Sequence, residues 1–537
     1  MRGCRRRASW MTTWSAASGT ARGTVERRTG GPDTGSLGLT TRMRLPWGPV
    51  VAMCLLSWGA WAEATPTPPV PRFERGACPV EVVPGERIDC GLLVVPENRH
   101  KADSRSIRLP VMIFRSRAAK PATDPVLFMP GGPGGSAVQH RTSGKGNPFL
   151  DERDYILLEQ RGAKFAQPAL ECPEINALKG EQAAGRLRGP AATAALSKAL
   201  GRCRETLTSA GVDLDGYTTE ATADDIEDLR KLLQLKTWNL FGMSYSTRLM
   251  LTVLRRHPTG VRSVLLDSVL PPEVNFDEVA GVNLLRSLHL VFDGCAVDRE
   301  CGALYPDLPA RFAKLVATAD RRPLALKLDA AATGGKPVEV RGAQVVEALY
   351  SALHDPAAIP LIPRIIGDAS EGRFERLTRL VQDNQGPSSF AFGLRYSVWC
   401  AEELPFENPA RMAAQRAASL GLGGVDEAAA SPEECRAWNV TAAPPVENTP
   451  VTSNVPTLIF AGEFDPDTPP EWSRRLLSAM PQAYSVEMRG RSHGASFHPC
   501  GLGIAMAFLR DPTRAPAVDC ALKLRGADFS LSAHPAN

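Results

Sequence analysis

The sequence predicts an α/β fold in which helices flank a mostly parallel sheet and a mainly helical cap is inserted. Short apolar runs bounded by Gly, Pro or polar residues recur in the first and last parts of the chain. Amphipathic helical segments separate them, and a long stretch without such runs lies between the two parts. Strands that alternate with helices imply a mainly parallel sheet covered on both faces.

Seven segments have the composition of short buried strands. Pro110 lies inside the first of them and suggests an edge position, because proline cannot donate to a β-ladder. Between them, residues 223–235 have acidic residues first, basic residues later and apolar positions near a 3.6-residue period, which indicates a helix. The seven segments are 107–114, 125–129, 155–158, 238–241, 264–266, 456–461 and 484–488.

The cap is predicted from the long interruption of this pattern. From Asp267 to Thr457 the chain has helical pieces, Pro-rich joints and four cysteines, far more than one crossover needs. We therefore divide the mature chain into a first core part (63–275), a cap (276–450) and a second core part (451–537).

The N-terminal region predicts export. Residues 1–42 are rich in Arg, Gly, Ser and Thr, and we interpret them as a non-native or disordered extension. Residues 43–62 have the form of a signal peptide, with a basic start, an apolar run and an Ala-Trp-Ala end, so the mature chain is expected to begin near Glu63 and to be secreted or periplasmic. The alternatives are a basic tail before a signal anchor, and a lipid anchor on Cys54, which the preceding Met53 disfavours.

The net charge and the cysteine content limit which classes of protein and which compartments fit the chain. The net charge is +4, from 62 basic and 58 acidic residues, which argues against a nucleic-acid partner. Only one apolar stretch, near the N-terminus, is long enough to consider as a membrane segment, so no integral span is expected after signal cleavage. Of the 12 cysteines, ten follow the signal peptide, and an oxidising compartment would pair them. The simplest proposal joins successive neighbours: Cys78–Cys90, Cys172–Cys203, Cys295–Cys301, Cys400–Cys435 and Cys500–Cys520.

A serine on a tight turn is the strongest chemical signal. The apolar run 238–241 leads into Gly242-Met-Ser244-Tyr-Ser246, and a helical segment follows. This is a nucleophile elbow, G-x-S-x-G, with Ser246 in the last small position. A serine hydroxyl is a weak nucleophile and must stand exposed on such a turn, with small residues two positions before and after it. The alternative is a serine that only caps a helix.

A glycine-rich loop could complete the site by stabilising negative charge. Residues 131–135 (Gly-Gly-Pro-Gly-Gly) follow a predicted buried strand and leave backbone N–H groups free to face a ligand. The amides near Gly132 and of Tyr245, the residue after the nucleophile, are the expected oxyanion hole. A plain turn is the alternative, and a phosphate loop is improbable because the G-K-[ST] ending is missing.

The acid and base are expected after the nucleophile, at the ends of later strands. Asp465 follows the strand 456–461, and Asp467 is its competitor. His493 lies on a loop with a flanking glycine after the last strand, and His498 ranks second because it lacks that glycine. The order Ser244, Asp465, His493 matches a hydrolytic triad.

These segments resemble proline iminopeptidases and secreted tripeptidyl aminopeptidases of the α/β-hydrolase fold. The matching residues are the 131–135 loop, the Glu159-Gln-Arg-Gly turn, the elbow, and the segments GEFDPDTPP (462–470) and SHG (492–494). Ser246 and Glu159 depart from the usual Gly and Asp of that family.

The resemblance implies a serine aminopeptidase that acts on peptides through an acyl-enzyme, and no cofactor is expected. No metal site is expected either, because the sequence has no C-x-x-C and no Cys/His cluster with zinc spacing. Glu402 and Glu403 in the cap are candidates for holding the free ammonium of the substrate, although a solvated helix start would explain them equally well. An esterase or lipase of the same fold is the alternative, and an inactive binding protein is a remote one. The sequence gives no indication of oligomeric state.

Overall fold

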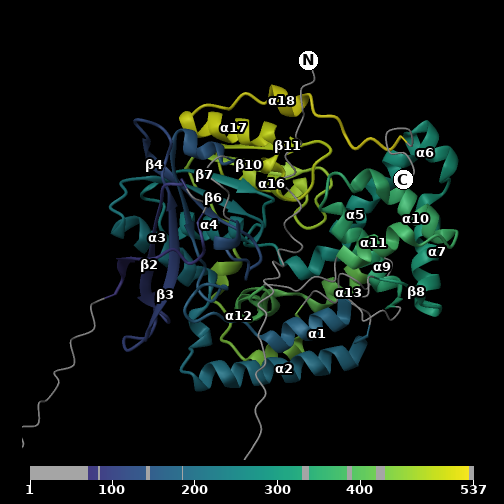
Figure 1. The fold of residues 1–537 in the computed structure, drawn as a ribbon, viewed down its shortest axis with the longest axis horizontal. Helices are drawn as coiled ribbons and strands as arrows, with labels where there is room; N and C mark the ends of the chain where they lie inside the picture. The colour runs from purple at the N-terminus through teal and green to yellow at the C-terminus, as the bar shows by residue number, and fades with distance from the viewer. Residues whose placement is uncertain are drawn as a thin grey trace, which may run out of the picture. The chain divides into compact units, whose positions relative to one another are not determined.

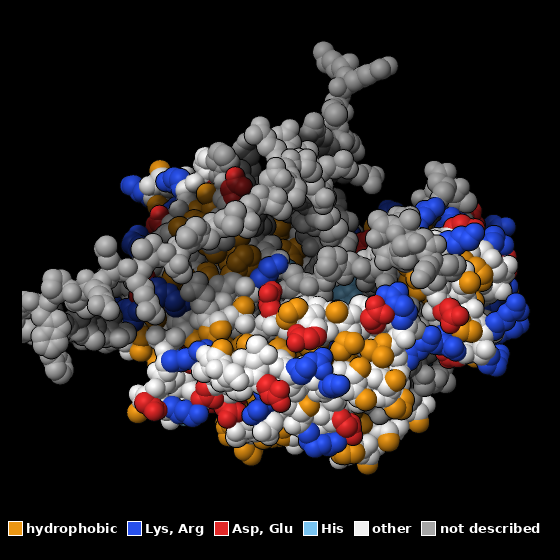
Figure 2. All heavy atoms as spheres, turned by 60° about the horizontal axis from the view of Figure 1, so that its bottom comes forward, with side chains coloured by type: hydrophobic (Ala, Val, Ile, Leu, Met, Phe, Trp, Pro, Cys, Tyr) orange, Lys and Arg blue, Asp and Glu red, His pale blue; other side chains and the backbone are white. Residues whose placement is uncertain are grey.

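The computed structural model describes residues 70–82, 85–140, 146–183, 186–328, 338–383, 390–418 and 430–530. The predicted extension (1–42), signal peptide (43–62) and Cys54 lie outside these ranges. Within them, no helix has the length and apolar composition needed to cross a bilayer. Basic and acidic side chains of the described residues are interspersed on the face drawn in Figure 2.

A nine-stranded sheet forms the core (Figure 1). The pairs β1–β2, β2–β3 and β3–β5 are antiparallel, and every later pair across the sheet is parallel. The parallel part brings the ends of β4, β6, β7 and β10 to one edge. In spatial order the strands are β1 (Arg72–Arg75), β2 (Ile88–Pro96), β3 (Ser106–Phe114), β5 (Arg153–Leu158), β4 (Ala122–Met129), β6 (Trp238–Met243), β7 (Val261–Asp267), β10 (Thr457–Gly462) and β11 (Ala483–Met488).

Alternation along the strands decides which helices cover each face. Leu127 and Leu240 pack with α3 (Thr219–Leu232), α4 (Tyr245–Arg256) and α16 (Pro470–Leu477). Their neighbours Phe128 and Phe241 point to the other face and pack with α17 (Pro499–Arg510). Because successive side chains of a strand point to opposite faces, both faces of the sheet are buried, as the apolar runs predict.

The residues between β7 and β10 are mostly helical. One buried cluster joins α5 (Phe276–Val297), α6 (Arg299–Leu304), α7 (Leu308–Arg321), α9 (Gly342–Leu353), α10 (Ile362–Ser370) and α11 (Glu375–Asp383). A second joins α12 (Phe392–Glu402) and α15 (Pro432–Trp438) to α1 (Pro173–Ala183) and α2 (Gly189–Ser209), which come from an earlier part of the chain. The other α-helices in the described ranges are α13 (Pro409–Ala418) and, after β11, α18 (Asp519–Leu522).

The structure corrects the strand predictions in three places. β1 and β2, at the antiparallel end of the sheet, were not among the seven predicted segments. A short antiparallel pair inside the cap, β8 (Leu324–Leu326) and β9 (Val338–Val340), was not expected. Pro110 was expected at an edge, but β3 lies between β2 and β5. Proline is tolerated there because β5 pairs only with residues 111–114, so Pro110 stands at the end of that ladder, where its carbonyl accepts from the Glu159 N–H.

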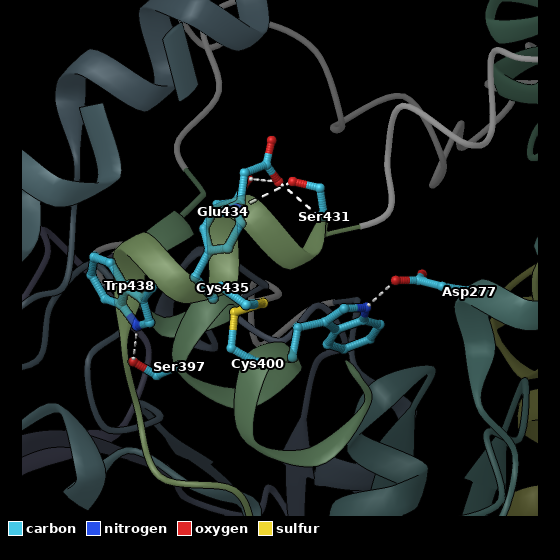
Figure 3. The surroundings of a disulfide bond; sticks show 9 residues. Asp277, Ser397, Cys400, Ser431, Glu434, Cys435 and Trp438 are labelled. Carbon is cyan, nitrogen blue, oxygen red and sulfur yellow. Dashed lines mark hydrogen bonds between the residues drawn. A yellow bond between two sulfur atoms is a disulfide. The ribbon is translucent and has the colours of Figure 1, made fainter. Parts of the chain in front are cut away.

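All five predicted cysteine pairs are disulfides in the structure. The Cys400–Cys435 bond joins α12 to α15 across 35 residues of sequence (Figure 3). The bond fixes α12, the cap helix that directly follows the residues packed against the glycine-rich loop. A cross-link of this kind stabilises the fold mainly by restricting the unfolded chain.

Candidate active site

Ser244 occupies the turn between β6 and α4 with a strained backbone. Its φ and ψ are 58° and −129°, and its N–H donates to the carbonyl of Asp267 at the end of the neighbouring strand. Only glycine fits at position 242, because a Cβ there would come 2.4 Å from the carbonyl oxygen of Ser246. Strain of this kind is typical of a nucleophile elbow, which presents the hydroxyl above the sheet edge.

Ser246 stands where the elbow motif usually has glycine, and its side chain forms a hydrogen bond. The residue is fully buried, and its hydroxyl donates a hydrogen bond to the carbonyl of Pro130. Pro130 begins the glycine-rich loop after β4. The departure from glycine therefore ties the start of α4 to that loop.

The glycine-rich loop lies against the nucleophile. A Cβ at Gly131 would come 2.9 Å from the Ser244 Oγ, and Gly132 has a φ of +130°. In the part of the chain that the structure describes, neither the Gly132 nor the Tyr245 amide donates a hydrogen bond. These are the two amides that the sequence predicts for the oxyanion hole, and both remain available to an acceptor.

Two charged residues brace this loop from outside. The buried Glu159 carboxylate accepts from the Ser136 hydroxyl at 3.0 Å and from the Val138 N–H at 3.1 Å. Arg395 on α12 donates to the Gly132 carbonyl at 3.0 Å. The loop conformation is thus held by the core on one side and by the cap on the other.

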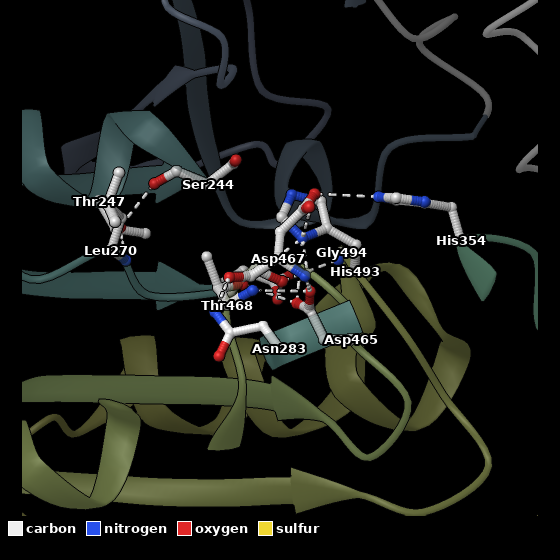
Figure 4. A network of polar contacts seen from close by, with 12 residues as sticks. Ser244, Thr247, Leu270, Asn283, His354, Asp465, Asp467, Thr468, His493 and Gly494 are labelled. Atoms are coloured by element: carbon white, nitrogen blue, oxygen red, sulfur yellow. Dashed lines mark hydrogen bonds and ion pairs between the residues drawn. The ribbon is translucent and has the colours of Figure 1, made fainter. Parts of the chain in front are cut away.

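His493 and Asp465 form a hydrogen-bonded pair (Figure 4). The His493 Nδ1 lies 3.0 Å from Oδ2 and 3.1 Å from Oδ1 of Asp465, whose side chain is completely buried. Thr468 donates to the same carboxylate through its N–H and its hydroxyl. Burial opposes ionisation of Asp465, but the positive charge and hydrogen bond of His493 outweigh it and hold the pKa well below its usual range.

The loop of His493 reaches the same sheet edge as the nucleophile. The Gly494 N–H donates to the Ser268 hydroxyl at 2.9 Å, and a Cβ at Gly494 would lie 3.5 Å from the sulfur of Met243. Within the described ranges, no hydrogen bond reaches the Ser244 hydroxyl. Free enzymes often show long or poorly aligned catalytic contacts that tighten in the substrate complex.

The two competing residues have other partners. Asp467 accepts from the Tyr350 hydroxyl at 2.6 Å and binds His354 at 3.0 Å, while its distance to the His493 Nδ1 is 3.9 Å. His498 caps α17, where its Nδ1 accepts from the Cys500 N–H. The geometry therefore favours Asp465 and His493 over both competitors.

Two further polar residues near the site were not predicted. Asp267 is fully buried at the end of β7 and accepts from the N–H and hydroxyl of Ser496; burial raises its pKa to about 6. Its place at a strand end was a usable signal. His354 follows α9 in the cap, where no motif marks it.

His354, Asp467 and His493 each place one possible ligand atom within 4.8 Å of the others. A hydrogen bond joins His354 to Asp467, Tyr350 is hydrogen-bonded to both of them, and His493 is hydrogen-bonded to Asp465. We therefore describe them as a hydrogen-bond network.

Glu402 and Glu403 are both buried, and each already has partners. Glu402 accepts from the N–H and the hydroxyl of Thr219, and burial raises its pKa to about 7. Glu403 forms a buried ion pair with Arg248 and accepts from the Phe276 N–H at 2.8 Å. The charge of Glu403 is thus compensated inside the protein.

An aromatic cavity of about 320 Å³ lies beside the glycine-rich loop. Phe390 and Arg395 line it, and both also touch the loop: a Cβ at Gly132 would come 3.2 Å from the Phe390 ring. Trp399 contributes its indole, over which Arg395 lies at 4.1 Å, and donates to Asp277 at 3.1 Å (Figure 3). The other lining residues are Lys179, Phe392, Tyr396 and Ala430.

The mostly parallel sheet and its flanking helices have the α/β-hydrolase fold, and comparison with known proteins agrees. The family model described as alpha/beta hydrolase fold matches residues 124–289, and the one described as TAP-like protein matches residues 425–520. Both models therefore match parts of the chain that contribute strands to the sheet, and together with the sheet topology they assign the α/β-hydrolase fold.

Curated relatives match part of the chain. A tripeptidyl aminopeptidase of Streptomyces lividans is 28% identical over 196 residues, which are 34% of this chain and 36% of that protein. A proline iminopeptidase of Arabidopsis thaliana is 25% identical over 213 residues, 39% of each chain. The matched region thus spans little more than a third of the length of these relatives.

Solved structures that resemble this chain include a proline iminopeptidase of Mycobacterium smegmatis. It is 15% identical, with 79% of this chain and 98% of that chain covered and a TM-score of 0.34. A thermophilic esterase of Thermogutta terrifontis is 13% identical, with 79% and 99% covered and a TM-score of 0.34.

Proposed function

We propose that this protein is an exported serine aminopeptidase that uses Ser244, His493 and Asp465 as its catalytic triad. One observation carries the proposal. At a single sheet edge, the buried Asp465 binds the His493 Nδ1 at 3.0 Å, and the hydroxyl of a strained Ser244 has no hydrogen bond to any residue that the structure describes. A carboxylate, an imidazole and a free serine hydroxyl in this order are the parts of an acyl-transfer triad.

The reaction follows from the role of each atom. His493 Nε2 takes the proton of Ser244 Oγ as that oxygen attacks the substrate carbonyl, while Asp465 fixes the Nδ1–H tautomer. The Gly132 and Tyr245 amides donate to the oxyanion. The imidazolium then gives its proton to the leaving amine, and water, activated by the same histidine, hydrolyses the acyl-enzyme.

The relatives that are peptidases support a peptide substrate. Carboxylates of the cap are the candidates for binding such a substrate. An aminopeptidase needs an anion for the substrate ammonium, because an unpaired buried charge is costly. Glu402 and Glu403 are our sequence-based candidates for it. Asp277 joins them as a comparison, since it hydrogen-bonds to Trp399, which lines the aromatic cavity, whereas the two glutamates face Thr219 and Arg248.

The first experiment tests the nucleophile. Ser244→Ala should lower turnover roughly 10³-fold or more while the melting temperature stays close to that of the unmodified protein. A fluorophosphonate probe should label the unmodified protein and leave the variant unlabelled. Activity near the original level in Ser244→Ala would remove this serine from the mechanism.

The second experiment separates peptidase from esterase. Rates are compared on an aminoacyl-arylamide with a free amine, the same compound with a blocked amine, and a short-chain aryl ester. Glu402→Gln, Glu403→Gln and Asp277→Asn are then measured on each. The variant that removes the ammonium anchor should lose activity on the free amine alone. Equal rates on free and blocked amines in the unmodified protein, with fast ester cleavage, would indicate an esterase.

Export is tested separately. The five disulfides support an oxidising compartment. N-terminal sequencing of protein secreted by a host should give a start near Glu63, and thiol titration after denaturation should detect no free cysteine. Several titratable thiols would contradict an exported, fully bridged chain.

A further inference from the structure

A cap histidine reaches the loop that carries the catalytic acid. His354 directly follows α9, and its Nε2 lies 3.0 Å from the Oδ2 of Asp467 (Figure 4). Its Nδ1 lies 3.0 Å from the backbone carbonyl of Tyr350. The contact bridges more than a hundred residues of sequence and joins the cap to the loop after β10.

The partners of His354 fix its protonation state. A carbonyl oxygen only accepts hydrogen bonds, and so does an ionised carboxylate. Both ring nitrogens must therefore donate, which makes the ring an imidazolium. The charge of Asp467 agrees with this, because it raises the pKa of His354 in spite of burial.

Asp467 stands close enough to compete with Asp465 for the catalytic histidine. Its Oδ2 lies 3.9 Å from the His493 Nδ1, against 3.0 Å for the Oδ2 of Asp465. Its own N–H donates to Asp465 Oδ1 at 2.9 Å, so the two carboxylates belong to one tight turn. An uncompensated charge on Asp467 would favour protonated His493 and would pull the ring away from Asp465.

We propose that His354 is a positioning residue: its imidazolium neutralises and holds Asp467, so that His493 stays on Asp465 and can act as a base. The Tyr350 hydroxyl assists by donating to the other oxygen of Asp467. The T-shaped contact of the His354 and His493 rings, 5.6 Å between centroids, leaves no direct hydrogen bond between the two histidines. The inference rests on the proposed function, because it assigns a task within the same triad.

The readout is the pH dependence of Ser244 labelling by a fluorophosphonate, which needs no knowledge of the natural substrate. Labelling slows at low pH as His493 becomes protonated. The groups around His354 and His493 that shape this titration are Asp467, Asp465, Asp267, Tyr350, Glu347 and Arg286. Of these groups, only Asp467 has its charge compensated by a direct contact with His354.

His354→Gln should move the acidic limb of the labelling profile upward by about half a pH unit or more, and should slow labelling at pH 7 roughly tenfold. Asp467→Asn should move the limb downward, because it removes a negative charge beside His493. The double variant should return the limb close to its original position. A residue that merely held the fold together would not give shifts of opposite sign that cancel.

The matched control is His289→Gln, on the exposed side of α5, which should leave the profile unchanged. A limb that stays in place or moves downward in His354→Gln would overturn the proposal. If His354→Gln does not fold, Tyr350→Phe keeps the ring, removes one donor to Asp467 and should move the limb in the same upward direction; an unchanged limb there would overturn it equally. Absence of labelling in the unmodified protein would overturn the triad itself, and so is distinguishable from failure of this inference alone.

Discussion

Gly131 lies directly against Ser244: a Cβ at position 131 would come 2.5 Å from the Ser244 Cβ. No real Cβ atom tolerates so short a distance, and the backbone on both sides is held in place. Gly131 is therefore required by the nucleophile beside it.

Gly131→Ala should lower activity by about 10²-fold or more, because the added methyl must displace the nucleophile or the loop that faces the oxyanion. The measurement is the rate of fluorophosphonate labelling together with the melting temperature. Gly201→Ala is the control, since a Cβ there meets nothing within 4 Å inside α2, and it should be neutral or slightly stabilising. Equal labelling by Gly131→Ala and the unmodified protein would show that the loop can move away.

Asp465→Asn should cost about 10⁴-fold in turnover, because an amide no longer holds the required tautomer of His493. Asp467→Asn, two residues away, should leave turnover at pH 7 within roughly tenfold, because Asp467 lies at 3.9 Å and is held by His354. Both variants preserve side-chain volume, so each controls for the other. A larger loss in Asp467→Asn would reverse the assignment of the acid.

Most of the fold and of the candidate site was predicted from the short apolar runs and from the residues that directly follow them. The run 238–241 and the turn at Ser244 are local features, and the structure has a strand and a strained turn there. Cysteine pairing was equally local, since neighbours along the chain are joined. The parallel core follows from the same short apolar runs, which need burial on both faces.

The features that could not be predicted from the sequence depend on tertiary contacts. Nothing near His354 signals that it meets Asp467, because the cap and the loop after β10 are brought together only by folding. Glu403 looked like a charged helix start, yet Arg248, 155 residues earlier, pairs with it in the interior. Pro110 looked like an edge residue because sequence does not reveal that β5 ends beside it. In each case the deciding partner is distant in sequence.

Glu403→Gln should destabilise the fold by about 3 kcal/mol, because the buried Arg248 guanidinium loses the negative charge of its ion-pair partner. Arg248 would retain the Val274 carbonyl at 2.7 Å, which cannot neutralise its charge. Denaturant unfolding measures the effect. Glu433→Gln, in an exposed pair with Arg436 on α15, is the control and should change stability by less than about 1 kcal/mol. A comparable small loss in both variants would mean that water reaches Arg248.

Glu402 should make the stability of the protein depend on pH. Its pKa is 4.5 in the unfolded reference and about 7 in the fold, where burial disfavours the charged form. The folded state therefore binds more protons between these values, so the contribution of Glu402 to stability falls as pH rises from about 4.5 to about 7 and stays low above that. Glu402→Gln remains neutral at every pH and keeps an acceptor for the Thr219 N–H. The difference in free energy of unfolding between this variant and the unmodified protein should thus shift in favour of the variant from pH 4 to pH 8, as urea unfolding at several pH values would measure. A difference that is independent of pH would show that the pKa of Glu402 is the same in the folded and unfolded states. Glu402 would then be ionised near neutral pH and would again be a candidate anchor for a substrate ammonium.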